Sequence, residues 1–281
     1  MNKTELLKFQ LEMGADESIG HTPVNRLLAA KKPVGSETVI EESRTATKAP
    51  TPSATAEPTM PATKKSSTPA LSSNVSAAIA KAKELASAAK TLEELRAAVQ
   101  SFDGLAIKKT ATNTVFSDGN RHAPVMFIGE APGANEDAEG IPFCGISGKL
   151  LDTMLGTIGI TRAENAYITN TIFWRPPGNR RPTPEELMIC RPFVEKHIAL
   201  LNPKMLVLVG GTATAALLDD SVSVSRLRGK FHSYKTPFAE NPYPVGVLFH
   251  PSYLLRSPLQ KRLAWHDLQI LRDRLEQDKV L

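Results

Sequence analysis

Cysteine is scarce in this sequence: Cys144 and Cys190 are the two thiols among 281 residues. So few cysteines exclude a disulfide-stapled scaffold and fit a reducing cytosol. Apolar runs long enough to span a membrane are missing too, and the first thirteen residues lack the apolar core of a signal peptide. We therefore expect a cytoplasmic protein, in a bacterial-type cytosol or nucleoid, without a membrane partner.

Aromatic residues are also few, and residues 32 to 74 contain almost none. This stretch is rich in Pro, Ser, Thr, Ala, Glu and Lys, and it cannot bury enough apolar surface to fold alone. We expect it to be a disordered linker between an N-terminal segment, residues 1 to 31, and a catalytic domain, residues 75 to 281. Within the first segment, Thr4 to Met13 is typical of a short amphipathic helix, which is a candidate docking element for a protein partner.

The chain has a modest excess of basic residues, with a formal net charge of +5 and a pI of about 9.1. Such a balance permits nucleic-acid binding without proving it. In the expected catalytic domain the excess is small, so the placement of individual Arg and Lys residues matters more than the total. We expect the protein to be a monomer.

From residue 99 onward, apolar strand-like runs alternate with helical patterns. Buried strands are expected near residues 125–129, 166–172, 205–210 and 245–249. Before them, we expect an Ala-rich helix over Ser76 to Lys90 and a second helix capped by Thr91. This alternation predicts an α/β fold with three layers, α/β/α, around a central, mostly parallel, four-stranded sheet.

A glycine- and carboxylate-rich segment follows the first of these strands. It runs from Gly129 to Asp137, and Phe143, Ser147 and Lys149 come soon after it. Open α/β sheets place ligands at such strand ends, and glycines let a ligand approach the backbone. The alternative is a strand-to-helix turn that carries solvated acids.

A histidine ends the last strand. His250 is fixed by Pro251 and is followed by Leu254, Leu255 and Arg256. An apolar wedge beside an arginine is what some proteins use to enter a base stack. Equally, the histidine can be a structural hydrogen-bonding group and the leucine pair ordinary core.

An asparagine and three arginines follow the second strand. Asn170 lies on this strand, and the Pro-Pro-Gly loop after it carries Arg175, Arg180 and Arg181. The planar guanidinium suits phosphates, and the asparagine amide offers one donor and one acceptor to a nucleobase edge. The alternative is a solvated basic turn.

Together these segments resemble the family 4 uracil-DNA glycosylases of the uracil-DNA glycosylase superfamily. The resemblance spans residues 91 to 275 and keeps the family's order and approximate spacing of motifs. The segments that carry it are Thr114 to Asn120, Gly129 to Gly133, Pro142 and Phe143, Asn170 to Pro182, Val207 to Gly210, and His250 to Ser252.

The resemblance implies a base excision repair enzyme that flips uracil out of DNA and hydrolyses its N-glycosidic bond, leaving an abasic site. Its implied catalytic residues are Glu130, Asp137, Asn170 and His250. His250 would stabilise the leaving uracil anion, and Asn170 would read the base edge. Glu130 is the leading candidate to position water or support the cationic sugar, with Glu136 and Asp137 as alternatives.

The resemblance also implies two sets of binding residues. Those of the uracil pocket are Gly129, Gly133, Phe143 and Asn170, with Phe143 stacking on the base. Those that hold the uracil-containing DNA are Ser147, Lys149, Arg175, Arg180, Arg181, Ser252, Leu254, Leu255 and Arg256. The two leucines would fill the gap that the base leaves. For Ser147 and Lys149, simple helix capping is an equal alternative.

One departure from the family concerns its four-iron, four-sulfur cluster, which family members typically bind through four cysteines. The matching positions here are Phe102, Leu105, Trp174 and Cys190, and Cys144 does not match a ligand position. One thiolate cannot hold a cluster that needs four protein ligands. We therefore predict a member without the cluster or any other cofactor, in which apolar residues fill the vacated volume.

Two other functions remain open. A superfamily relative traps the base covalently through a basic loop inserted before its histidine, but here Phe249 leads straight into His250. A non-catalytic DNA-binding module is the second, and the joint presence of Glu130, Asn170 and His250 counts against it. The motifs do not rank uracil against hypoxanthine or xanthine, nor single-stranded against double-stranded DNA.

Overall fold

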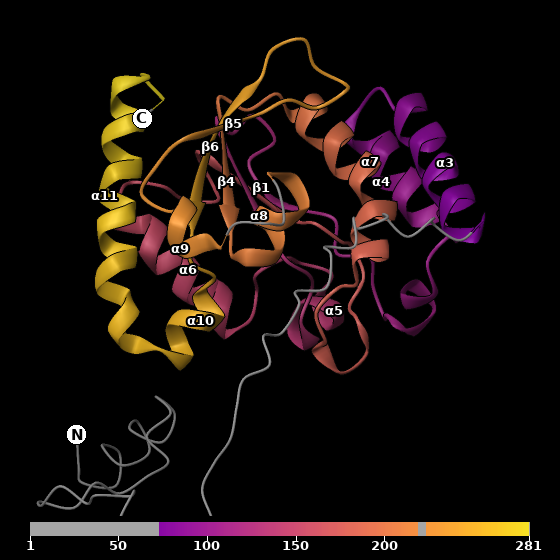
Figure 1. Ribbon diagram of the computed structural model, residues 1–281, viewed down its shortest axis with the longest axis horizontal. Coiled ribbons are helices and arrows are strands. Elements are labelled where there is room, and N and C mark those ends of the chain that lie inside the picture. Colours follow the sequence, from indigo (N-terminus) through magenta and orange to yellow (C-terminus); the bar gives the residue numbers. More distant parts are fainter. Residues whose placement is uncertain (1–72, 219–222, 281) are drawn as a thin grey trace, which may run out of the picture. The chain divides into compact units, whose positions relative to one another are not determined.

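The computed structural model describes residues 73 to 218 and 223 to 280, and Figure 1 labels its α-helices and several of its strands. The helix expected over Thr4 to Met13 and the expected linker up to residue 72 lie outside these ranges. The first described element is helix α3 (Ser73–Ala88), which begins three residues before the Ala-rich helix that the sequence predicts.

The centre of the fold is a sheet whose four long strands are parallel to one another. They are β2 (Val125–Gly129), β3 (Ala166–Asn170), β4 (Met205–Val209) and β6 (Tyr243–Leu248). The full strand order is β1-β3-β2-β4-β6-β5. Strands β2, β3 and β4 are buried throughout, as expected of the inner strands of a parallel sheet with helices on both faces. The predicted α/β class and the four central strands are therefore confirmed.

The sheet has six strands rather than the expected four. The two additional strands lie at its edges: β1 (Asp118–Gly119) pairs antiparallel with β3, and β5 (His232–Tyr234) pairs antiparallel with β6. With two and three residues, they are too short to show an alternating apolar pattern of their own. Only their pairing with β3 and β6 identifies β1 and β5 as strands.

Helices cover both faces of the sheet, as Figure 1 shows, and make the expected three layers. Met126 and Ile128 of β2 share an apolar cluster with α3, α4 (Leu92–Ser101) and α7 (Pro184–Leu201). Val125 and Phe127 point the other way, into a cluster with α6 (Ile146–Gly156), α10 (Pro251–Arg256) and α11 (Lys261–Gln277). Shorter helical segments are η1 (Ala106–Thr110), α5 (Ala134–Glu139), η2 (Pro177–Asn179), α8 (Gly211–Leu217), α9 (Val224–Leu227) and η3 (Pro258–Gln260).

Side-chain caps begin helices α4 and α7. Thr91 accepts a hydrogen bond from the Glu94 amide at 3.1 Å and starts α4, as the sequence predicts. Thr183 starts α7 through a reciprocal capping box with Glu186. Of the helices that the structure describes, none has the length and apolarity needed to cross a bilayer.

A fully buried histidine lies between α7 and the sheet. The His197 ring stacks on Phe116 with centroids 4.3 Å apart, and its Nε2 lies 2.7 Å from the Tyr167 hydroxyl. Its Nδ1 finds no hydrogen-bond partner within the described part of the chain. Burial, reinforced by the charge of Arg96, lowers the pKa of His197 to about 3.

We expect this histidine to make the fold sensitive to acid. Its pKa lies below that of an unfolded histidine, so the unfolded chain binds the extra proton and stability falls as the pH drops below about 6.5. Between pH 7 and pH 5 the expected loss is about 2 kcal/mol of unfolding free energy. Denaturant unfolding of the wild type and His197→Phe at both pH values measures it. The variant should lose less over this interval, and an equal loss in both proteins would contradict the assignment.

Candidate active site

The four parallel strands end at one edge of the sheet. Gly129, the last residue of β2, is paired with Asn170, the last residue of β3. On the other side of β2, Val209 of β4 is paired with Leu248 of β6. The residues at these carboxyl ends line a cleft of about 1630 Å³, at the place where open α/β sheets bind ligands.

Glu130 enters the cleft directly after β2. Its carboxylate Oε2 accepts a hydrogen bond from the hydroxyl of Thr212, near the N-terminus of α8. Its backbone carbonyl accepts a second hydrogen bond from the Thr171 hydroxyl. Segments that follow two strand ends therefore hold Glu130, and the residue lines the cleft.

Asn170 is 1% exposed, and neither its amide nitrogen nor its amide oxygen has a hydrogen-bond partner in the described ranges. The residue nevertheless lines the cleft. Leaving a buried polar group unpaired costs about 1–3 kcal/mol, so such groups in a native fold need an explanation. A ligand that offers one acceptor and one donor would satisfy both atoms.

His250 is the N-cap of α10. Its Nδ1 accepts a hydrogen bond from the Ser252 amide at 3.2 Å and lies 2.8 Å from the Ser252 hydroxyl. A backbone amide can only donate, so Nδ1 carries no proton and the neutral ring holds its proton on Nε2. Burial lowers the pKa of His250 below its usual value, although the nearby Glu130 carboxylate opposes this. The site therefore offers a neutral N–H donor at pH 7.

Phe143 brings an aromatic ring against the same residues. Its ring centroid lies 5.6 Å from that of His250. A Cβ atom on Gly129 would lie 2.4 Å from Phe143 Cζ and 2.5 Å from Asn170 Oδ1, so only glycine fits between them. The backbone of Phe143 is left-handed, with φ of 53°. For a non-glycine residue this conformation costs on the order of 1–3 kcal/mol and persists only where the surroundings impose it.

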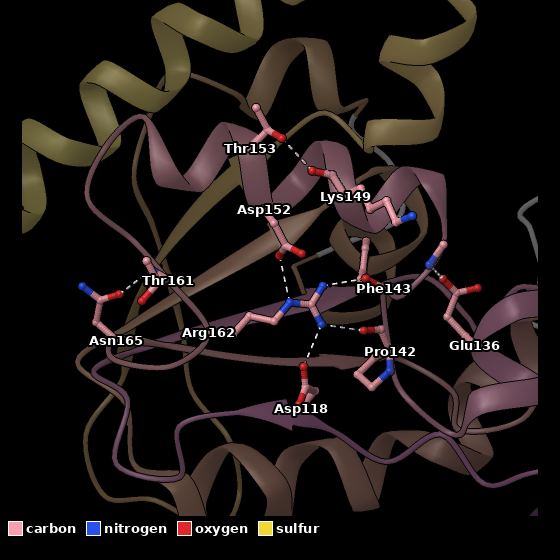
Figure 2. A network of polar contacts seen from close by, with 11 residues as sticks. Asp118, Glu136, Pro142, Phe143, Lys149, Asp152, Thr153, Thr161, Arg162 and Asn165 are labelled. Carbon is pink, nitrogen blue, oxygen red and sulfur yellow. Dashed lines mark hydrogen bonds and ion pairs between the residues drawn. The ribbon is translucent and has the colours of Figure 1, made fainter. Parts of the chain in front are cut away.

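The other acidic residues of the segment hold its backbone. Glu136, which is labelled in Figure 2, accepts hydrogen bonds from the amides of Gly133 and Gly145 at 3.0 and 2.9 Å. The buried Asp137 accepts from the amides of Thr112 and Asn113 at 2.8 and 3.2 Å. Asp137 is not among the residues that line the cleft, so the structure does not bring this expected catalytic residue to the site.

The expected DNA-binding residues divide into three groups. Those that line the cleft are Ser147, Arg180, Arg181, Ser252 and Arg256. Lys149, Arg175 and Leu255 lie outside the lining and are at least partly exposed. Leu254 is fully buried in the core with the helices on its side of the sheet, so this expected wedge residue does not face DNA.

Two of the arginines are already paired. Arg180 makes a bidentate ion pair with Glu186, with N–O distances of 2.9 and 2.6 Å. Although burial would raise it, the hydrogen bond from Arg180 holds the pKa of Glu186 below its usual value. Arg175 donates to the Asn179 side chain at 2.7 Å. Arg181 is exposed on the same loop and lines the cleft.

The positions that correspond to the family's cluster ligands are packed together in the core. Phe102 and Trp174 stack with centroids 6.5 Å apart, and Phe102 meets Phe193 edge-on at 5.2 Å. Leu105 and Cys190 are buried as well, and burial raises the pKa of the Cys190 thiol. The residues present, with one thiol among four positions, do not fit an iron–sulfur cluster.

Sequence reasoning missed two residues of the site. Thr212 holds Glu130 across 82 positions of the chain, and Arg162 holds the backbone of Phe143 from 19 positions away. Neither belongs to a local motif. The glycine pair at the end of β4, Gly210 and Gly211, was the available signal for Thr212, because it marks a strand-to-helix turn like that after β2.

Comparisons with known proteins agree with this geometry. The family model described as "Uracil DNA glycosylase superfamily" matches residues 116–269. A type-4 uracil-DNA glycosylase of Thermotoga maritima is 38% identical over 167 residues, which cover 56% of this chain and 81% of the relative. For the type-4 enzyme of Archaeoglobus fulgidus the identity is 35% over 173 residues, with 60% and 85% covered. That of Sulfurisphaera tokodaii is 33% identical over 187 residues, with 65% and 84% covered.

An α/β/α fold with this cleft, and a family match over more than half of the chain, define the class of protein: the chain belongs to the uracil-DNA glycosylase superfamily and is a glycosylase. Within the superfamily, the relatives confirm the family 4 assignment that the motifs predict.

Proposed function

We propose that this protein is a monofunctional uracil-DNA glycosylase of base excision repair, which removes uracil from DNA and leaves an abasic site. The observation that carries the proposal is Asn170, a fully buried amide at a strand end whose donor and acceptor both lack partners within the described residues. The polar edge of uracil offers the complementary pair. The names of the relatives support the same substrate.

The base is recognised on its edge and on its face. The Asn170 amide oxygen accepts the N3–H of uracil, while its NH₂ group donates to O4. Cytosine has an acceptor and a donor at these positions, and mismatched groups would stay buried and unpaired at a cost of about 1–3 kcal/mol. The ring of Phe143 stacks on the base. Uracil in a duplex cannot reach this pocket, so the nucleotide must be flipped out of the stack.

Bond breaking leaves negative charge on the base and a cationic sugar. His250 donates its Nε2–H to the uracil O2, where this charge develops, and its backbone position at the start of α10 fixes the donor in advance. The Glu130 carboxylate, held by Thr212, positions the attacking water or stabilises the cationic sugar. The bond between N1 and C1′ breaks, and water supplies the hydroxyl group at C1′ and the proton that the base finally carries.

DNA lies across the mouth of the cleft. Ser147, Arg181, Ser252 and Arg256 contact its backbone, since these residues line the cleft and none is fully buried. Leu255, which is partly exposed at the end of α10, takes the wedge role alone, because Leu254 is in the core. Lys149 and Arg175 are peripheral phosphate contacts.

We expect the protein to work without iron. Protein purified under anaerobic conditions should be colourless and contain no stoichiometric iron or sulfide, because Phe102, Leu105 and Trp174 stand where thiolates would be needed. Metal analysis by mass spectrometry and a sulfide assay measure this directly. Iron and sulfide near four atoms each per chain would overturn the expectation.

Incubation of the full-length protein with an oligonucleotide that carries one uracil, followed by alkali, tests the proposed function. Strand scission at the uracil, and none in a thymine control, is the expected result. A shifted but uncut band in a gel would instead indicate a DNA-binding module, and no effect on single- or double-stranded DNA over a range of salt concentrations would refute the proposal.

A further inference from the structure

Phe143, the stacking residue of the proposed pocket, has an unfavourable backbone conformation. Phe143 is left-handed without being a glycine or an asparagine, and it lies three residues before α6. Helix α6 packs closely against the backbone of Phe143: a Cβ on Gly148 would lie 1.7 Å from the Phe143 carbonyl oxygen. Without contacts that hold it, this segment would relax to a more favourable backbone conformation, and the Phe143 ring would turn away from the pocket.

One arginine holds the segment in place, as Figure 2 shows. From the turn between α6 and β3, Arg162 donates from Nη1 to the Pro142 carbonyl at 2.8 Å and from Nη2 to the Phe143 carbonyl at 2.5 Å. It therefore grips two successive peptide groups, one on each side of the Phe143 Cα atom. Fixing both peptide planes fixes φ and ψ of Phe143, and with them the direction in which its side chain leaves the backbone.

The arginine is itself held by two carboxylates. Its Nε donates to Asp152 on α6 at 2.8 Å, and Nη1 donates to Asp118 on β1 at 2.9 Å. The Arg162 side chain is 19% exposed. Although burial would lower it, these hydrogen bonds raise the pKa of Arg162 above its usual value, so its charge is permanent.

We propose that Arg162 is the positioning residue for base stacking: its guanidinium locks the backbone of Pro142 and Phe143 so that the Phe143 ring faces the base. This inference rests on the proposed uracil excision. Arg162 is not among the residues that line the cleft, so it acts through Phe143 and does not touch substrate. Lysine keeps the charge but lacks the planar fork needed to grip two carbonyls and two carboxylates together.

Single-turnover uracil release, with enzyme in saturating excess over DNA, tests the proposal. At saturation the rate constant reports the folded enzyme, so a variant that merely folds less well changes it little. Arg162→Lys should lower this rate constant by about 10- to 100-fold, as expected when a reacting group is misplaced by about 1 Å. The matched control is Arg274→Lys on α11, which weakens an ion pair with the C-cap residue Asp278 and should keep the wild-type rate.

A double-mutant cycle separates positioning from general support of the fold. If Arg162 acts through the ring, Phe143→Ala should be slow, and adding Arg162→Lys to it should slow it by no more than about twofold. Independent effects that multiply in the double variant would overturn the proposal. So would a wild-type rate for Arg162→Lys.

A variant that does not fold and a wild-type protein without activity have separate consequences. Should Arg162→Lys fail to fold, Asp152→Asn takes its place, with a smaller loss expected that again vanishes in the Phe143→Ala background. Wild-type rates for Asp152→Asn would then overturn the inference. A wild-type protein that releases no uracil would refute the proposed function instead, so the two failures are distinguishable.

Discussion

Replacing His250 with alanine is expected to lower the single-turnover rate of uracil release by about 10²- to 10³-fold, the usual cost of losing a preorganised donor to a developing anion. The binding of uracil-containing DNA should change far less, because the donor matters most as charge moves onto the base. The reason lies in the geometry. Nδ1 is occupied by the Ser252 amide, and a neutral Nε2–H remains for the base.

Rapid-quench kinetics with excess enzyme, together with a DNA titration, measure both quantities. His122→Ala is the matched control, since this exposed histidine lies just before β2, at the end of the sheet opposite the cleft, and its loss should be silent. A wild-type rate together with wild-type affinity for His250→Ala would show that the residue is only a helix cap. A loss of affinity at an unchanged rate would point to ground-state binding instead.

Replacing Asn170 with alanine is expected to separate activity from stability. Both hydrogen bonds to the uracil edge would be lost, which should lower kcat/KM on the order of 10²-fold and weaken inhibition by free uracil in parallel. Discrimination against cytosine should weaken as well. The fold should not suffer, because both amide atoms are buried without partners among the described residues and their removal relieves a desolvation cost.

Steady-state kinetics and thermal unfolding of the same preparation measure the two effects. Asn165→Ala makes a useful contrast, because its side chain accepts from the Thr161 amide at 2.8 Å and its loss should reduce stability. A clear drop in the melting temperature of Asn170→Ala, with kcat/KM preserved, would mean that this amide serves the fold and not a ligand.

The central part of the fold was predictable because its signals are local. Strands β2 and β4 are nearly continuous apolar runs and β3 and β6 are largely apolar, which is typical of strands buried on both faces. The edge strands β1 and β5 were missed because two or three residues carry no periodicity of their own. They are defined only by pairing with β3 and β6, to which the chain brings them in three dimensions.

Site residues at strand ends could be predicted from the sequence. Those on short helices could not, because helix geometry decides which way their side chains point. Glu130, Asn170 and His250 come at or just after strand ends, and parallel strands bring those ends to one edge. Asp137 and Leu254 lie on short helices. A shift of one residue along a helix turns the side chain by about 100°, which can move it from the cleft to the core. Arg162 and Thr212 act on residues far along the chain, so no local pattern reveals them.

The central claim is that this cleft hydrolyses the glycosidic bond of uracil, and mass spectrometry of one reaction tests it most directly. The full-length protein is incubated with a uracil-containing oligonucleotide in the presence of a chelator. The masses of the released base, the DNA and the protein are then measured. We predict free uracil, an equal amount of oligonucleotide with one abasic site and an uncut backbone, and a protein of unchanged mass. An intact oligonucleotide bound at saturation, or a protein that carries DNA covalently, would contradict the claim.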